Sequence, residues 1–215
     1  MEILPYSINS GQVNMDIDSE LLENAIAQGI KKPVFRLYGW EPACVSLGRN
    51  QNDSFLNKEL LRKHNIDVVR RLTGGRALLH DNEITYSYVC PVSYLENGEQ
   101  VVSSYKEISQ ILIDKFKKLG IELDFGTSKS VKTGFDYCML ISTGADLCYE
   151  NKKLIGSAQC RKNGYILQHG SILYDYDKNL LEEIFGEEVS TDEITSIKEI
   201  NPNLTKEKII EILSI

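Results

Sequence analysis

The spacing of hydrophobic residues along the chain predicts two long helices. Apolar residues recur every three or four positions within Asp16–Ile30, where Asp16 can cap the helix and Gly29 can end it. A second apolar stripe with helical spacing runs through Ser103–Leu119, and Gly120 follows it. The pattern therefore predicts helices over both ranges.

Shorter segments in the middle of the chain are typical of strands. The dipeptide Asn163-Gly164 between two such segments predicts a tight hairpin, and Thr73-Gly74-Gly75 is expected to form the turn between two others. The expected strands are Pro33–Trp40, Cys44–Leu47, Val68–Arg71, Arg76–His80, Ile84–Val92, Ile121–Phe125, Ala145–Tyr149, Lys153–Gln159 and Tyr165–Tyr174.

The remaining segments predict short helices and one loop. The polar segment Thr127–Gly134 is expected to be a mobile loop that leads to Cys138. Helices are expected at Asn57–His64, Leu180–Phe185, Thr191–Glu199 and Thr205–Leu213. Because the 215 residues show no break in composition, we expect one α/β domain over residues 1–215.

Composition excludes several classes of protein. The chain is 42% hydrophobic and 26% charged, which is typical of a globular domain. A net charge of −7 argues against a nucleic-acid partner. The chain has no apolar run near the roughly 20 residues that cross a bilayer, so we expect no membrane partner and a cytoplasmic protein. The five cysteines are scattered without metal-ligand spacing, so we expect free thiols and no metal.

Basic residues are concentrated around one part of the sequence. They are either a solvated charged face or a docking site for an acidic partner, and the sequence does not choose between the two. These residues are Lys129, Lys132, Lys152, Lys153, Arg161 and Lys162.

Two segments place small residues beside charged ones in a way that a purely structural sequence does not need. They are RRLTGGRALLHD at Arg70–Asp81 and KKLIGSAQCRKNGYILQHGSIL at Lys152–Leu173. Adjacent glycines allow a close approach of backbone to ligand, and their N–H groups can bind an anion or a carbonyl oxygen. Candidate positions are Gly74-Gly75 and Gly156-Ser157-Ala158.

Together with the cysteine between them, these segments resemble the biotin/lipoate protein ligase superfamily. Within it, the sequence is most similar to the cysteine-dependent octanoyltransferases of lipoate biosynthesis, from about residue 14 to residue 177. The resemblance implies an α/β (α+β) fold: a mixed, mostly antiparallel sheet packed with helices, plus a smaller sheet. It also implies an apolar tunnel between the sheets that holds the acyl chain.

The resemblance assigns roles to individual residues. Cys138 matches the catalytic cysteine, although Met139 follows it where the family usually has an aromatic residue, and Lys153 matches the lysine of the Lys-x-x-Gly-Ser-Ala-Gln strand. The expected substrate-binding residues are Arg71, Thr73, Gly74, Gly75, Arg76, His80, Gly156, Ser157, Ala158, Gln168, His169 and Gly170.

The expected chemistry is acyl transfer through a thioester. A thiolate exchanges with a thioester without ATP, so no cofactor is expected. A neighbouring ammonium such as that of Lys153 lowers the pKa of a thiol by favouring its anion. His80 or His169 could then help to remove the proton from an acceptor lysine. An equally weighted alternative is that His80 only bonds a backbone carbonyl.

The expected partners are octanoyl-acyl carrier protein as donor and a glycine-cleavage H protein, or another lipoyl domain, as acceptor. One alternative is an ATP-dependent lipoate-protein ligase, against which the Gly-Gly-Arg at residues 74–76 argues, since ligases usually carry Gly-Gly-Gly there. An amidotransferase between lipoyl domains and an inert acyl-binding protein are further alternatives.

The other cysteines and His64 are expected to be structural. Cys90 and Cys148 lie in apolar strand segments and are expected in the core, whereas Cys160 adjoins the motif and its role stays open. His64 is on a polar helix and is expected to be exposed.

Overall fold

The computed structural model describes residues 1–126, 137, 139, 144 and 146–215. Cys138, the expected loop Thr127–Gly134, Lys129 and Lys132 lie outside the described residues. Within the described part, no helix is long and apolar enough to cross a membrane.

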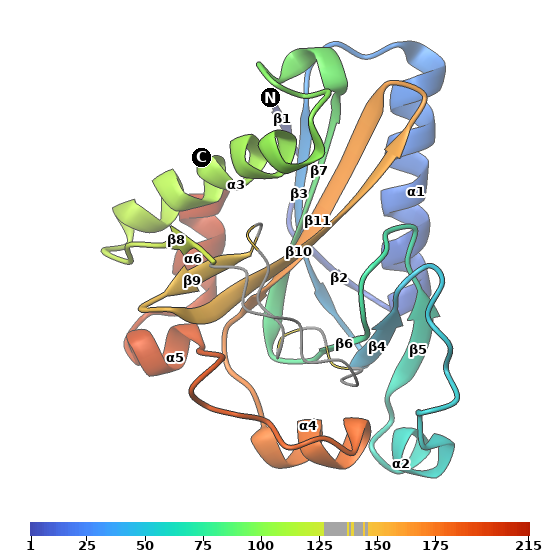
Figure 1. The fold of residues 1–215 in the computed structure, drawn as a ribbon, viewed down its shortest axis with the longest axis vertical. Coiled ribbons are helices and arrows are strands. Elements are labelled where there is room, and N and C mark those ends of the chain that lie inside the picture. The colour runs from blue at the N-terminus through green and yellow to red at the C-terminus, as the bar shows by residue number, and fades with distance from the viewer. Residues whose placement is uncertain (127–136, 138, 140–143, 145) are drawn as a thin grey trace.

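A large, mostly antiparallel sheet forms the centre of the fold (Figure 1). Its order is β1-β3-β7-β11-β10-β9-β8, and β2 also pairs with β3. The inner pairs are antiparallel, whereas β1 and β2 run parallel to β3. The strands are β1 Glu2–Ile3, β2 Ser7–Asn9, β3 Val34–Trp40, β7 Glu83–Pro91, β8 Asp124–Phe125, β9 Leu147–Tyr149, β10 Lys152–Lys162 and β11 Tyr165–Leu173.

A smaller sheet has the order β5-β4-β6, with β4 at Cys44–Leu47, β5 at Asp67–Arg70 and β6 at Leu78–His80. Thr73-Gly74-Gly75 lies between β5 and β6, as expected, but these two strands are not neighbours in the sheet and form no hairpin. Strand β4 lies between β5 and β6, parallel to the first and antiparallel to the second, and takes the hydrogen bonds that a hairpin would have formed. The expected two-sheet fold is confirmed.

Helices cover both faces of the large sheet (Figure 1). Helix α1 packs on β3, β7 and β11, and α3 lies on the other face beside α6. Buried hydrophobic side chains of both sheets and of α3 and α6 form the main core. The helices are α1 Gly11–Gln28, α2 Lys58–Lys63, a 3-10 turn at Val92–Tyr94, α3 Val101–Lys118, α4 Lys178–Phe185, α5 Ile197–Ile200 and α6 Lys206–Leu213.

Two helix predictions were wrong in extent. Helix α1 begins at Gly11, so Asp16, the expected cap, lies inside it. The expected helix Thr191–Glu199 is reduced to α5, which Ser196 and Glu199 cap reciprocally. Before it, residues 191–193 form a turn and Ile194 bridges to β10: Lys153 N–H donates to Glu193 O, and Thr195 N–H donates to Lys153 O. Tertiary pairing thus overrides the local helical pattern.

The long hairpin β10–β11 has the expected turn. Asn163 and Gly164 have φ of 48° and 78°, so both lie in the left-handed region that a type I′ turn requires. The turn fixes the register in which Gly156 lies opposite Ser171 and Ala158 opposite His169.

Replacing Gly164 with alanine tests the importance of this turn. The Gly164→Ala variant should lower the free energy of unfolding by about 1–2 kcal/mol, because a Cβ disfavours left-handed backbone by that amount. Urea unfolding measures the change. As a matched control, Asn163→Gly should stay within about 0.5 kcal/mol of the wild type. Equal losses in both variants would contradict the assigned turn.

Candidate active site

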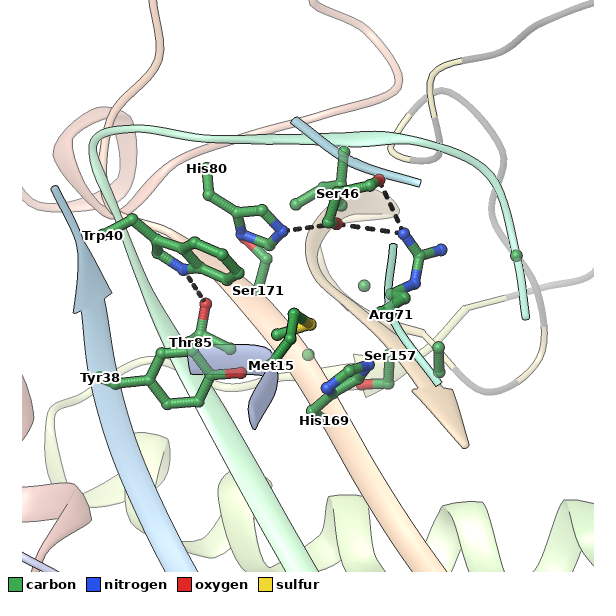
Figure 2. Close-up of a pocket in the computed structure, with 15 residues that line it drawn as sticks. Met15, Tyr38, Trp40, Ser46, Arg71, His80, Thr85, Ser157, His169 and Ser171 are labelled. Atoms are coloured by element: carbon green, nitrogen blue, oxygen red, sulfur yellow. Dashed lines mark hydrogen bonds between the residues drawn. The ribbon is translucent and has the colours of Figure 1, made fainter. Parts of the chain in front are cut away.

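A cavity lies between the two sheets, and Met15 of α1 also lines it (Figure 2). The space within and at the mouth of this cavity amounts to about 470 Å³, part of it open to solvent, and most of the wall is apolar. Its lining residues include the apolar or aromatic side chains of Met15, Tyr38, Trp40 and Leu78. A cavity of this kind suits a hydrocarbon chain, because each buried methylene contributes about 0.8 kcal/mol.

The structure brings most of the expected substrate-binding residues to this cavity. Thr73, Gly74, Arg76 and Gln168 do not line it. Eight expected residues do: Arg71, Gly75, His80, Gly156, Ser157, Ala158, His169 and Gly170.

The guanidinium of Arg71 organises one wall of the cavity. It is 7% exposed. Its Nε donates to Thr73 Oγ1 at 3.1 Å, and its Nη1 donates to Ser46 O at 2.9 Å and to Ser46 Oγ at 3.1 Å. Its Nη2 donates to Gly74 O at 2.9 Å and to Arg76 O at 2.7 Å. Arg71 therefore joins β4 to the segment between β5 and β6, and Thr73, Gly74 and Arg76 contact this wall through its guanidinium.

His80 is held between a hydroxyl and a carboxylate. Its Nε2 lies 2.8 Å from Ser46 Oγ, its Nδ1 lies 3.1 Å from Glu83 Oε1, and its ring stacks on Trp40 with centroids 3.9 Å apart. Burial lowers the pKa of His80 below its ordinary value, although Glu83 acts in the opposite direction. A neutral ring that donates from Nδ1 and accepts at Nε2 satisfies both contacts. His80 thus bonds side chains rather than the backbone carbonyl that was the alternative.

His169 repeats this arrangement on the neighbouring wall. Its Nε2 lies 2.7 Å from Thr73 Oγ1 and its Nδ1 lies 3.0 Å from Asp18 Oδ2. The same carboxylate accepts from Tyr38 Oη at 2.9 Å, and its other oxygen pairs with Arg36 Nη1 at 3.1 Å. Because both ring nitrogens of both histidines are occupied, neither one presents a free nitrogen to a ligand in this arrangement.

Lys153 is buried beside the cavity, with 1% of its side chain exposed. Its Nζ lies 3.1 Å from Asp146 Oδ2, and the Asp146 side chain is 3% exposed. A Cβ built on the cavity-lining Gly156 would come within 3.3 Å of Lys153 Nζ and 2.8 Å of Met139 Sδ. Only glycine leaves this space between the ammonium group and the strand.

The described residues on either side of Cys138 in the sequence contact this region. Tyr137 forms a bridge with Ala77, next to the cavity-lining Leu78. Met139 is fully buried, and its sulfur lies over Gly156. Cys138 itself is outside the described residues.

Gln168 lies on the opposite face of β11, toward α3. Its Nε2 donates to Tyr86 Oη at 2.9 Å, and its Oε1 accepts from Gln159 Nε2 at 3.0 Å. Tyr86 Oη lies 2.7 Å from Ser157 Oγ, which belongs to a residue that lines the cavity. Because side chains alternate along a strand, Gln168 supports the wall from behind.

The described members of the basic group do not form one basic surface. Lys153 is buried, and Lys162 Nζ pairs with Glu23 Oε1 at 2.5 Å. Arg161 donates to Ser104 Oγ and to the carbonyl oxygens of Gly98 and Glu99. The docking-site alternative finds no support among these described residues.

The other thiols and His64 mostly match expectation. Cys90 and Cys148 are buried, as predicted, whereas Cys160 is half-buried. Burial raises the pKa of the Cys90 thiol to about 12, so this thiol stays protonated and inert at neutral pH. His64 has part of its side chain exposed and lies 3.1 Å from Glu183 Oε2.

Sequence reasoning missed several residues that line the cavity. Ser171 follows His169 by two positions in a strand, so the alternation of side chains could have placed it on the same face. Met15, Tyr38 and Trp40 carried no comparable signal, because each fits an ordinary core position. The missed lining residues are Met15, Tyr38, Trp40, Ser46, Leu78, Thr85 and Ser171.

The large, mostly antiparallel sheet, the smaller sheet and the helices that cover them define the class of fold. Solved structures of lipoate-protein ligases have the same fold. Lipoate-protein ligase A bound with ATP has a TM-score of 0.76 at 20% identity, over 99% of this chain and 81% of that one. LipL1 of P. falciparum in complex with lipoate has a TM-score of 0.74 at 21% identity, over 98% of this chain and 60% of that one.

The chain belongs to the lipoyl protein ligase A/B catalytic domain family, whose model matches residues 10–214. Its sequence is similar to proteins named octanoyltransferase LipM. The protein from Macrococcus caseolyticus is 40% identical over 82% of this chain and 67% of its own length. The protein from Clostridioides difficile is 40% identical over 81% of this chain and 65% of its own length. The protein from Bacillus subtilis is 38% identical over 80% of this chain and 64% of its own length. The chain thus spans about two thirds of the length of these relatives.

The lowered pKa of His80 predicts a dependence of stability on pH. Below the ordinary histidine pKa of about 6.5 the unfolded chain binds a proton that the folded His80 resists, so stability is lost as pH falls through that value. The melting temperature should therefore fall from pH 7 toward pH 5.5, and less steeply in His80→Gln. A His80→Gln variant with the wild-type slope would contradict this assignment.

Proposed function

We propose that this protein is an octanoyltransferase that forms an acyl-enzyme at Cys138. It takes the octanoyl group from an acyl-carrier-protein thioester and passes it to a lysine of a lipoyl-domain protein, such as a glycine-cleavage H protein. The similarity to the LipM octanoyltransferases supports this activity. We propose further that residues 1–215 act as one catalytic domain in the cytoplasm, where thiols stay reduced.

The observation that carries the proposal is the buried Lys153 ammonium beside an apolar cavity. The cavity accommodates the hydrocarbon chain, and Lys153 lies next to Gly156 in its wall. Met139, the residue after Cys138, contacts the same glycine. A thiol in this neighbourhood would have its pKa lowered by the ammonium, and the carbonyl oxygen would be polarised by the same charge.

The reaction needs no external energy source. The Cys138 thiolate attacks the carbonyl carbon, the bond to the carrier sulfur breaks, and the carrier leaves as a thiolate. The acceptor amine then attacks the acyl-enzyme, loses a proton, and releases the Cys138 thiolate. The second step is downhill because an amide is more stable than a thioester.

Intact mass spectrometry after mixing with octanoyl-acyl carrier protein tests the nucleophile. One octanoyl group should add to the wild type and to Cys160→Ser, a half-buried thiol that serves as the matched control, and to Cys148→Ala. Cys138→Ser should remain unmodified, because an alkoxide does not form at neutral pH. A label that persists in Cys138→Ser would overturn the assignment. Modification of the acceptor by Cys138→Ser with ATP and free lipoate would indicate a ligase instead.

A paired substitution tests the charge on Lys153 without leaving a buried charge unpaired. Removing one partner of a buried pair costs about 3–5 kcal/mol, whereas replacing both with neutral groups is far less harmful. Lys153→Gln combined with Asp146→Asn should therefore fold and lower the transfer rate by about 10²-fold or more. The rate is measured as steady-state transfer of the octanoyl group to an apo-lipoyl domain.

The matched control is the exposed pair Lys162–Glu23 on the same strand and α1. Exposed pairs contribute about 0–1 kcal/mol, so Lys162→Gln with Glu23→Gln should leave both rate and stability near those of the wild type. A folded Lys153→Gln/Asp146→Asn protein that transfers at the wild-type rate would show that the ammonium has no part in the reaction.

A further inference from the structure

Ser171 differs from the other hydroxyl-bearing residues in the wall of the cavity. It lies on β11, is 2% exposed, and borders the cavity (Figure 2). Among the described residues its Oγ has no hydrogen-bond partner. The remaining lining hydroxyls are paired within the wall: Tyr38 with Asp18, Ser46 with Arg71 and His80, Thr85 with Trp40, and Ser157 with Tyr86.

A buried hydroxyl without a partner is costly. It forfeits about 1–3 kcal/mol compared with a satisfied one, which is why such groups are rare in folded proteins. In the wall of a binding cavity, the bound molecule can supply the missing partner. Ser171 therefore marks a place where the ligand carries a polar atom.

The position of Ser171 identifies the part of the ligand concerned. Ser171 and Gly156 are directly opposite each other on the paired strands β11 and β10, so their side-chain positions point to the same face, about 5 Å apart. A Cβ built on Gly156 would lie 3.3 Å from Lys153 Nζ. The free hydroxyl and the buried ammonium thus border the same part of the wall.

We propose that Ser171 Oγ–H donates a hydrogen bond to the carbonyl oxygen of the bound acyl group. This role rests on the proposed octanoyl transfer. The hydrocarbon part of an octanoyl thioester has no polar atom, and its sulfur is a weak acceptor, so the carbonyl oxygen is the strong acceptor available to Ser171. Ser171 keeps its proton throughout; the carbon–sulfur bonds form and break as described for the transfer.

The hydrogen bond should strengthen as the reaction proceeds. When the thiolate adds to the carbonyl carbon, negative charge develops on the oxygen that Ser171 and Lys153 face. A donor that is already oriented toward this oxygen stabilises the transition state more than the bound substrate. Loss of the hydroxyl should therefore lower kcat while leaving KM nearly unchanged.

Three variants test this role in steady-state transfer from octanoyl-acyl carrier protein to an apo-lipoyl domain. Ser171→Ala should lower kcat by about 10²-fold, the usual effect of removing one such donor. Ser171→Thr keeps the hydroxyl and should restore most of the rate. Ser87→Ala is the matched control, because Ser87 Oγ is equally buried and unpartnered on neighbouring β7 but does not border the cavity.

Melting temperatures separate this role from a structural one. Neither Ser171→Ala nor Ser87→Ala removes a hydrogen bond from the part of the chain that the structure describes, so neither should melt below the wild type. If the wild type is active and Ser171→Ala leaves kcat unchanged, the role of Ser171 is overturned but the proposed function is not. The same holds if Ser87→Ala lowers kcat as much as Ser171→Ala does. A wild type that transfers no octanoyl group would overturn the proposed function, and this role with it.

Discussion

The candidate active site depends on the guanidinium of Arg71. Its hydrogen bonds reach β4, Thr73, and the carbonyl oxygens on both sides of Gly75. Through the hydroxyls of Ser46 and Thr73 it also connects to the two histidines. A continuous network therefore runs from Glu83 through His80 and Arg71 to His169 and Asp18. Apart from Glu83 Oε2, the side-chain polar groups of this network satisfy one another, so this part of the wall can face an apolar chain at little cost. Among the described residues, the Ser171 hydroxyl is the unpaired group that borders the cavity.

A second constraint is the burial of Lys153 with Asp146. Two charges leave water here, and their attraction offsets that cost only when the geometry is good. The main chain of Lys153 is fixed as well, because its N–H and C=O bond to Glu193 and Thr195. Both the head and the base of this side chain are thus held in place. Such restraint suits a charge that has to meet a developing negative charge without reorganising.

The sequence predicted those parts of the fold that local signals determine. Helix α3 follows from its apolar stripe, and the β10–β11 turn from Asn163-Gly164. Long-range pairing decided the rest: the strand-like contacts of Thr195 displaced a predicted helix, and β4 came between β5 and β6. Eight of the fifteen residues that line the cavity were predicted from the two sequence motifs. Trp40 and Met15 were missed because burial against a ligand and burial in a core select the same residue types.

The hairpin β10–β11 contains residues that border the cavity and residues that face the helix on the other side of the sheet. His169 faces the cavity and α1, whereas Gln168 faces α3 and reaches the wall only through Tyr86 and Ser157. Alternation along a strand makes this division automatic, since neighbouring residues must lie on opposite faces. A short motif such as Gln-His-Gly-Ser therefore contains both kinds of residue in turn. Its glutamine bonds to side chains on the α3 side of the sheet, whereas its histidine and serine border the cavity, so the four residues do not share one position relative to the cavity.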